Sequence, residues 1–381
     1  AELGVAHRKR LGVLLLARIG RLGCGGSAGR RTACEPPVGR VGVGAVVSLH
    51  PWPETLGELV SKPLRDLVPL ALVLPALHPC PLQVRVSAHL ANAGLDVLLL
   101  DILPKEPNAD EQAQGLTLDS PRVRNRIARD GLTGLAKMKP APFYLKEDAD
   151  RITPGNLVDD LAQLKGCDWV IEVVIESLPI KKQLFASILP HLAADTVLSS
   201  NTSGLSINAM AEELPAAVRK NFLITHFFNP PRYMRLLEMV PCQETDPAVV
   251  AGMADFISRR LGKGIVSAKD TPNFIANRIG VYAIFKGIEH MLAMEMTVEE
   301  VDAIAGPATA RPKSAAFRTA DLVGIDTLIH VANNSYASLP DDEEREVFKV
   351  PDFMNGMVEK GLLGNKSRAG FYKKEIVDGE K

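Results

Sequence analysis

The sequence has few cysteines and almost no net charge, and these shortages exclude several classes of protein. Its five cysteines, an odd number, are scattered and form neither a CxxC pair nor a Cys/His spacing typical of zinc sites. We therefore expect free thiols in a reducing compartment. The net charge is −1, whereas a dedicated nucleic-acid binder needs a basic excess to meet the phosphates.

The sequence also lacks an apolar segment that could form a membrane-spanning helix or an uninterrupted secretory signal. Residues 67–84 carry no charge and are long enough to span a bilayer, but four prolines between positions 69 and 81 would break a membrane helix. Arg8-Lys9-Arg10 and the apolar residues after it imitate a secretory signal, which Arg18 and Arg21 interrupt. We expect neither a membrane span nor secretion.

What is present is an ordinary globular composition, with 46% hydrophobic and 23% charged residues. A length of 381 residues favours two or three domains. The first 82 residues differ from the rest, since they hold 9 of the 27 prolines and 11 of the 30 glycines. Residues 23–28 satisfy G-x-G-x-x-A, but arginines and then Pro36-Pro37 follow where that motif requires a helix, so we interpret the match as fortuitous.

Short apolar runs alternate with amphipathic stretches from residue 84 onward. This alternation predicts an α/β fold with a doubly wound, mostly parallel sheet. Gly94 suits a left-handed helix C-cap, and Ser206 suits an N-cap. Strands are expected at 96–101, 169–175, 197–200, 222–228, 236–240 and 264–268, and helices at 84–93, 123–137, 180–192, 206–214 and 246–261.

After Asp270 the strand-like runs end, and helices are expected at 272–294, 298–304 and 352–363. We place a domain boundary near residue 268. Three parts result: an atypical, poorly ordered segment at 1–82, an α/β domain at 83–267 and a smaller all-helical domain at 268–381.

His226 ends an apolar strand, and Glu238 lies twelve residues later, beyond the Pro230-Pro231 turn. Two strands joined by that turn would run back to back, so the carboxylate could reach the imidazole. A His–Glu pair is a general base with an orienting partner. The alternatives are a packed or surface histidine and a solvated charge at a strand end.

Several motifs occur in order and at suitable separations, and together they closely resemble the L-3-hydroxyacyl-CoA dehydrogenase family. The resemblance runs from about residue 86 to Tyr372. Residues 311–327 are more similar to the dehydrogenase portion of multifunctional fatty-acid oxidation proteins than to the short-chain enzymes. The motifs are Asn201-Thr202-Ser203, His226-Phe227-Phe228-Asn229-Pro230, Glu238, Lys269-Asp270-Thr271-Pro272 with Asn277-Arg278, and Gly370-Phe371-Tyr372.

The resemblance implies a Rossmann-like domain followed by a helical domain, and oxidation of a 3-hydroxyacyl-CoA. His226 would be the base that removes the hydroxyl proton, and Glu238 would orient it. Ser203 and Asn277 would hydrogen-bond the reacting oxygen and stabilise its developing charge. A local turn hydrogen bond for Ser203 and a helix-surface amide for Asn277 are the alternatives.

The resemblance also implies NAD as the cofactor and acyl-CoA as the substrate. Asp101 ends an expected strand, where an acidic side chain binds ribose hydroxyls and repels the additional phosphate of NADP. Lys137, on a basic helix, would meet the CoA phosphates, or else lie on a solvated face. The expected cofactor-binding residues are Asp101, Glu176, Lys181, Ser203, Asn229 and Lys366, and those for substrate are Ser203, Asn277 and Lys137; for Lys366 generic surface polarity is the alternative.

The resemblance fails before residue 84. The family's three turn glycines should fall near positions 78, 80 and 83, where this chain has His78, Cys80 and Gln83, with Pro79 and Pro81 between them. Since prolines remove amide donors and fix the backbone, we expect this turn not to form and NAD affinity to fall below that of an intact relative. The sheet's first strand should be missing, or replaced by an apolar run such as 71–74.

Two functions therefore remain open. The first is an NAD-dependent dehydrogenase, alone or as part of a larger beta-oxidation protein. The resemblance implies that it dimerises through its helical domain. The second is a non-catalytic acyl-CoA-binding or structural relative that has lost its cofactor. The expected location is the cytoplasm, or the mitochondrial matrix or peroxisome of a eukaryotic cell.

Overall fold

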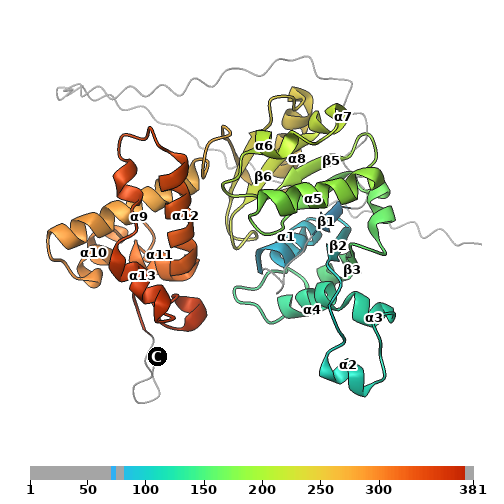
Figure 1. Ribbon diagram of the computed structural model, residues 1–381, viewed down its shortest axis with the longest axis horizontal. Coiled ribbons are helices and arrows are strands. Elements are labelled where there is room, and N and C mark those ends of the chain that lie inside the picture. Colours follow the sequence, from blue (N-terminus) through green and yellow to red (C-terminus); the bar gives the residue numbers. More distant parts are fainter. Residues whose placement is uncertain (1–69, 74–80, 374–381) are drawn as a thin grey trace, which may run out of the picture. The chain divides into compact units, whose positions relative to one another are not determined.

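An eight-stranded sheet organises the first part of the computed structural model, which describes residues 70–73 and 81–373 (Figure 1). The strand order is β3-β2-β1-β4-β5-β6-β7-β8. Neighbouring strands pair in parallel except β6 and β7, which confirms the predicted mostly parallel sheet. The strands are β1 (Leu70–Val73), β2 (Val97–Asp101), β3 (Ile152–Asn156), β4 (Trp169–Glu172), β5 (Val197–Ser200), β6 (Phe222–Phe227), β7 (Leu236–Pro241) and β8 (Gly264–Ser267).

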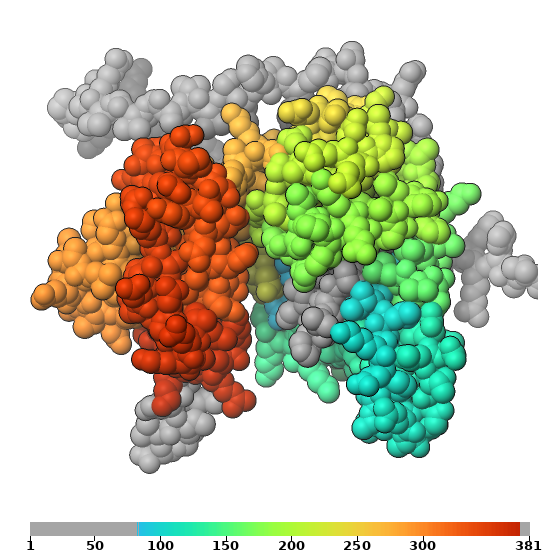
Figure 2. Space-filling view, in the orientation of Figure 1, coloured from blue at the N-terminus to red at the C-terminus, as the bar shows by residue number. Residues whose placement is uncertain are grey.

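Helices cover both faces of this sheet, and successive residues of each strand point to opposite faces. In β2, Val97 and Leu99 pack in one hydrophobic cluster with α1, α4 and α8, while Leu98 and Leu100 pack in a second with α5 and α6. The segment with α2 and α3 projects beyond the sheet layers (Figures 1 and 2). The helices here are α1 (Pro81–Asn92), α2 (Ala109–Ala113), α3 (Pro121–Arg124), α4 (Arg126–Leu135), α5 (Leu178–Ile188), α6 (Ile207–Ala211), α7 (Ala216–Arg219) and α8 (Pro247–Leu261).

A strand does precede α1. β1 lies between β2 and β4 and pairs with both. Of the two alternatives for the first strand, the prediction that it is missing was wrong. The prediction that an apolar run replaces it is confirmed, at Leu70–Val73. β1 and the start of α1 lie within the segment that was expected to be poorly ordered. Pro81 is tolerated in the first turn of α1, where no intrahelical amide donor is needed. The predicted failure of the turn concerns residues 74–80, which lie outside the described residues, as does the match at 23–28.

The predicted caps are confirmed. Gly94 has φ +82° after α1, and the Ser206 side chain accepts from the Ala209 amide. The structure adds a cap at α8, where the Asp246 side chain accepts from the Ala248 amide.

Several predicted boundaries need correction. The helix expected at 123–137 is two helices divided at Asn125, whose side-chain oxygen accepts from Asn156 Nδ2. Helix α9 (Ala276–Ala293) begins at Ala276 rather than at 272, since Asn273 and Phe274 have positive φ. Strand β4 ends at Glu172, α5 ends before Pro190, α6 ends at Ala211, and the last helix, α13 (Asp352–Glu359), ends at Glu359. Strand β3 was not predicted because it contains Pro154, which an edge strand tolerates.

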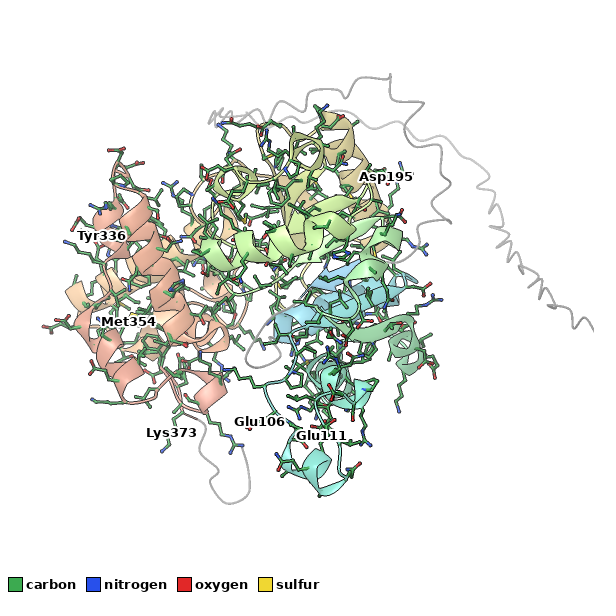
Figure 3. All side chains as sticks on the ribbon, turned by 45° about the vertical axis from the view of Figure 1, so that its right-hand side comes forward. Glu106, Glu111, Asp195, Tyr336, Met354 and Lys373 are labelled. Atoms are coloured by element: carbon green, nitrogen blue, oxygen red, sulfur yellow. The ribbon has the colours of Figure 1, made fainter. Side chains whose placement is uncertain are left out.

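Helices dominate the described chain after β8. Their apolar faces form a third hydrophobic cluster, which includes Met354, labelled in Figure 3. The apolar spacing did not reveal α11 or α12. The helices are α9 (Ala276–Ala293), α10 (Val298–Ile304), α11 (Phe317–Val323), α12 (Ile325–Ser338) and α13 (Asp352–Glu359). The division of the chain at 82/83 and 267/268 stays a prediction.

The Gly370-Phe371-Tyr372 motif closes this helical part. The buried Asp321 carboxylate accepts from the amides of Phe371 and Tyr372, at 2.9 Å each. A Cβ at position 370 would lie 2.0 Å from Asp321 Oδ1, so only glycine permits this approach.

Candidate active site

His226 and Glu238 face each other across the antiparallel pair β6 and β7. His226 Nδ1 lies 2.8 Å from Glu238 Oε2, and both side chains are buried. The turn after β6 returns the chain so that the two residues share one register position, as the sequence predicted. With Nδ1–H donating to the carboxylate, Nε2 is the ring nitrogen that can accept a proton.

Glu238 is fixed from a second side. Its Oε1 accepts from the amides of Ile275, at 3.0 Å, and Ala276, at 2.8 Å. Burial alone would raise the pKa of this carboxyl, but the hydrogen bonds from His226 and from the two amides prevail, and the pKa lies below its ordinary value. Glu238 is therefore a carboxylate that orients the imidazole without sharing its proton.

The loop that carries Ser203 is tied to the His226 strand. Asn201 Oδ1 accepts from the Phe227 amide at 2.8 Å. The imidazole contacts two phenyl rings, with its centroid 4.4 Å from that of Phe228 and 5.9 Å from that of Phe274. Backbone and ring contacts thus restrict both the loop and the base.

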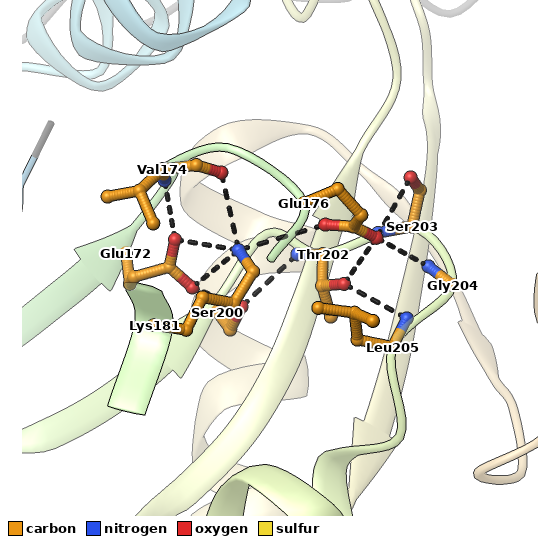
Figure 4. A network of polar contacts seen from close by, with 9 residues as sticks. All are labelled: Glu172, Val174, Glu176, Lys181, Ser200, Thr202, Ser203, Gly204 and Leu205. Carbon is orange, nitrogen blue, oxygen red and sulfur yellow. Dashed lines mark hydrogen bonds and ion pairs between the residues drawn. The ribbon is translucent and has the colours of Figure 1, made fainter. Parts of the chain in front are cut away.

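The Glu176 carboxylate accepts hydrogen bonds from the loop of residues 202–204 (Figure 4). Its Oε1 accepts from Thr202 Oγ1 at 2.6 Å and from the amides of Ser203 and Gly204 at 3.0 and 2.9 Å. The Ser203 hydroxyl lies 3.5 Å from the same oxygen, a long contact that leaves it able to donate elsewhere. Ser203 is half-buried, so a ligand atom can reach it.

Lys181 is buried, and its ammonium group is already engaged (Figure 4). Its Nζ lies 2.8 and 2.9 Å from the two carboxylate oxygens of Glu172 and 3.3 Å from the Val174 carbonyl oxygen. It is also 3.7 Å from Glu176. In this arrangement Lys181 supports the carboxylate that holds the Ser203 loop, rather than presenting a charge to solvent.

The other expected site residues lie in different surroundings. Asp101 is buried at the end of β2, where its Oδ1 accepts from the Ile102 amide at 2.7 Å. Asn229 is exposed and accepts from Arg85 Nη1 at 3.1 Å. Lys137 is exposed just beyond α4.

Asn277 and Lys366 both lie in the helical part. Asn277 is half-buried in the first turn of α9. Lys366 forms an ion pair with Asp326 in the first turn of α12.

Sequence reasoning missed several residues that hold this site. Glu172 is the one charged residue inside the apolar run WVIEVVI, which is a signal that it has a buried partner. Its Oε2 accepts from the Ser200 hydroxyl, whose oxygen accepts from the Thr202 amide at 3.2 Å. No sequence signal indicated the contact of Arg85 with Asn229.

Two further predictions concern thiols and membranes. Cys167 and Cys242, the two cysteines in the described ranges, are buried free thiols. Among residues 70–73 and 81–373, no helix is long and apolar enough to cross a membrane. In the same ranges no three His, Cys, Asp or Glu side chains are grouped to hold a metal ion.

Comparison with protein families gives two matches. Residues 84–271 match the model of the 3-hydroxyacyl-CoA dehydrogenase NAD binding domain, and residues 274–374 match that of the 3-hydroxyacyl-CoA dehydrogenase C-terminal domain. A probable 3-hydroxyacyl-CoA dehydrogenase of Bacillus subtilis is 51% identical over 76% of this chain, which spans 37% of that protein. Another, from Deinococcus radiodurans, is 43% identical over 76% of this chain and 79% of its own length.

Solved structures show the same fold. FadB2 of M. tuberculosis matches with a TM-score of 0.64 and 27% identity, over 81% of this chain and 99% of its own. The (S)-3-hydroxybutyryl-CoA dehydrogenase PaaH1 of Ralstonia eutropha matches with a TM-score of 0.60 and 25% identity over the same shares.

Proposed function

The chain belongs to the 3-hydroxyacyl-CoA dehydrogenase family, and we propose that it oxidises an L-3-hydroxyacyl-CoA to the 3-oxoacyl-CoA with NAD as hydride acceptor, in fatty-acid beta-oxidation. The observation that carries this proposal is the buried pair of His226 and Glu238, 2.8 Å apart. It commits Nδ1 to the carboxylate and leaves Nε2 to act as a base.

His226 removes the proton of the 3-hydroxyl group. The O–H bond breaks, the proton moves to Nε2, and the oxygen electrons form the new C=O bond as the C3–H bond breaks. The hydrogen leaves C3 with its electron pair, for which bound NAD would supply the acceptor. The Glu238 carboxylate stabilises the imidazolium that results, since it stays ionised through the step.

Ser203 and Asn277 would donate hydrogen bonds to the reacting oxygen and stabilise its developing charge. The Glu176 contacts support this role for Ser203, since the backbone amides of residues 203 and 204 are both fixed by one carboxylate. A fixed donor stabilises charge without reorganising at the moment of reaction.

The described residues fit NAD in part. The strand order 3-2-1-4-5 places a topological switch point between β1 and β4, where dinucleotides bind beyond the carboxyl ends of the strands. Asp101, at that end of β2, would bind the adenosine ribose. Asn229 and Lys366 are proposed at the nicotinamide end, while Glu176 and Lys181 would act by holding Ser203. The His78, Cys80 and Gln83 residues depart from the family's glycines, so we propose weakened affinity.

Lys137 is proposed to meet the CoA phosphates, because it is exposed and lies beside other basic residues. Assembly as a homodimer through the helical part, and function as part of a larger beta-oxidation protein, are proposed from the family. The chain spans 37% of the Bacillus relative, which leaves room for further domains in such a protein. The proposed location is the cytoplasm, or the matrix or peroxisome of a eukaryotic cell.

A dehydrogenase assay with short and long L-3-hydroxyacyl-CoA substrates tests the function. We expect NADH formation with the L and not the D enantiomer. An NADH titration separates the binding-only alternative, which predicts acyl-CoA affinity without NADH affinity. The Bacillus and Deinococcus relatives are described as dehydrogenases and give that alternative no support.

A further inference from the structure

Asn273 lies in the turn that leads from β8 to α9, and its side chain is buried against α12. Its Nδ2 donates to Ser335 Oγ at 2.6 Å and lies 3.4 Å from the Val331 carbonyl oxygen. The Ser335 hydroxyl itself donates to that carbonyl oxygen at 3.0 Å, so its oxygen is free to accept from Asn273. These contacts fix the amide nitrogen of Asn273 toward α12 and leave Oδ1 to meet another part of the chain.

The side-chain oxygen of Asn273 faces the loop that carries Ser203. A Cβ added at Gly204 would lie 2.8 Å from Asn273 Oδ1, which is closer than real Cβ atoms approach other atoms. The φ of Gly204 is not positive, so this contact, rather than the backbone conformation, is what requires glycine there. The Gly204 amide donates to Glu176 (Figure 4). The Ser203 loop therefore contacts both Glu176 and Asn273.

The backbone of Asn273 takes an uncommon conformation. Its φ is 60° and that of Phe274 is 48°, both in the left-handed region, which asparagine tolerates better than most residues and a bulky residue disfavours. The amides of Ile275 and Ala276, which follow directly, are the two that donate to Glu238. Such a conformation persists only where the surrounding contacts hold it, and the bond from Asn273 to α12 is one of them.

Asn273 is thus connected to several parts of the candidate active site without belonging to it. Its turn aims two amides at Glu238, its Oδ1 meets the residue after Ser203, and Asn277 follows in the first turn of α9. The next residue, Phe274, contacts the His226 ring. The proposed base and the proposed oxygen donors must align on one substrate oxygen, so a small displacement of this turn slows the reaction.

We propose that Asn273, anchored to Ser335, is a positioning residue that holds the Ser203 loop and the two amides of the α9 turn in place beside the His226–Glu238 pair. It acts through these groups and not on the substrate. The inference rests on the proposed function for its effect on turnover, whereas its effect on the His226–Glu238 hydrogen bond can be measured without turnover. Asn273 lies between the Lys269–Pro272 and Asn277-Arg278 motifs and belongs to neither.

Asn273→Gly removes the side chain and still permits the positive φ. We expect kcat for L-3-hydroxybutyryl-CoA to fall by about 10- to 100-fold, as for a small misplacement of reacting groups, with little change in KM for either substrate. Ser335→Ala removes the acceptor on α12 and should lower kcat in the same direction, so it tests the same contact if Asn273→Gly does not fold. Asn333→Ala, at an exposed asparagine of α12, is the matched control and should keep the wild-type kcat and KM.

Gly204→Ala tests the contact with the Ser203 loop. Its methyl group would displace Asn273 Oδ1 and should lower kcat, and the same change should cost much less in the Asn273→Gly background, where that oxygen is gone. Asn334 Nδ2 lies 3.0 Å from the same Cβ position, so G204A/N334A identifies which neighbour matters and should retain the loss seen in Gly204→Ala. Losses that multiply in N273G/G204A, or relief by Asn334→Ala, would overturn the contact with Asn273.

The proton on His226 Nδ1 gives a measurement that does not depend on turnover. Its NMR signal lies far downfield because the proton bonds a carboxylate, and its loss in Glu238→Gln identifies it. Asn273→Gly and Ser335→Ala should broaden this signal well below the unfolding temperature, because Glu238 is then held less firmly and the proton exchanges faster. If the signal broadens but the wild-type chain forms no NADH, the proposed function fails while the positioning role stands. A signal that is unchanged in both variants overturns the proposal.

Discussion

Glu238→Gln is the substitution that probes the base most sharply. The amide has nearly the same shape and its oxygen can still accept from the Ile275 and Ala276 amides. Its NH₂ group then faces His226 Nδ1 and donates to it, which reverses the hydrogen bond. The imidazole must carry its proton on Nε2, where the substrate hydroxyl needs an acceptor.

The expected loss is that of the general base. Positioned acid–base groups contribute roughly 10²–10⁴-fold, so we expect kcat to fall by about that factor with a much smaller change in KM.

The same substitution has a separate effect on stability. The pKa of Glu238 is lowered in the folded chain, so its carboxylate stabilises the fold above the ordinary pKa of 4.5, and this contribution is lost as pH falls towards the folded pKa. Glu238→Gln should lack this acid-dependent loss in urea denaturation. Glu212→Gln, at an exposed carboxylate that pairs with Lys182, is the control and should change turnover little. Wild-type kcat in Glu238→Gln would refute the coupling of His226 with Glu238.

Three further predictions concern the buried side chains of His89 and Lys181 and the segment of residues 1–83. Burial, with the charge of Lys263, lowers the pKa of His89 to about 4 from 6.5, so stability should fall as pH drops from 6.5 towards 4, by roughly 3 kcal/mol in total, and His89→Leu should remove this dependence in urea titrations. Lys181→Met leaves the Glu172 carboxylate buried without its cation and should lower the free energy of unfolding by about 3–5 kcal/mol. The double variant K181M/E172L should recover most of this loss, and equal stabilities of the single and double variants would contradict the argument. Replacing residues 1–83 with a strand and a G-x-G-x-x-G turn should tighten NADH binding in a fluorescence titration, and an unchanged Kd would show that the native segment binds NAD as well as the glycine turn does.

The sequence predicts most strands of the sheet because buried parallel strands are continuous apolar runs between polar ends. It also predicts the pairing of His226 with Glu238, since a double-proline turn reverses the chain between them. β3 escapes detection because Pro154 and Gly155 interrupt its apolar pattern. α12 escapes because polar residues alternate with its buried ones, and only packing against α9 and α13 selects the helix.

The sequence likewise predicts some residues of the site and not others. Ser203, His226 and Glu238 follow from motif and register, whereas the support of Ser203 by Glu176, and of Glu176 by Lys181, depends on how two strand ends meet. Lys181 was expected to bind the cofactor. The sequence pattern of α5 did not indicate that the Lys181 ammonium group donates a hydrogen bond to the Glu172 carboxylate. Contacts between side chains that follow neighbouring strands can be predicted only when the strand order is known. The sequence of one chain does not specify that order.

The most direct measurement compares NADH formation from L-3-hydroxybutyryl-CoA by the wild-type chain and by His226→Ala. The wild-type chain should form NADH at saturating NAD. His226→Ala should lose roughly 10²–10⁴-fold in kcat, because the substitution removes Nε2, the proposed base. NADH formation at the wild-type rate in His226→Ala would contradict the assignment of His226, and its absence in the wild-type chain despite bound NAD would contradict the dehydrogenase function.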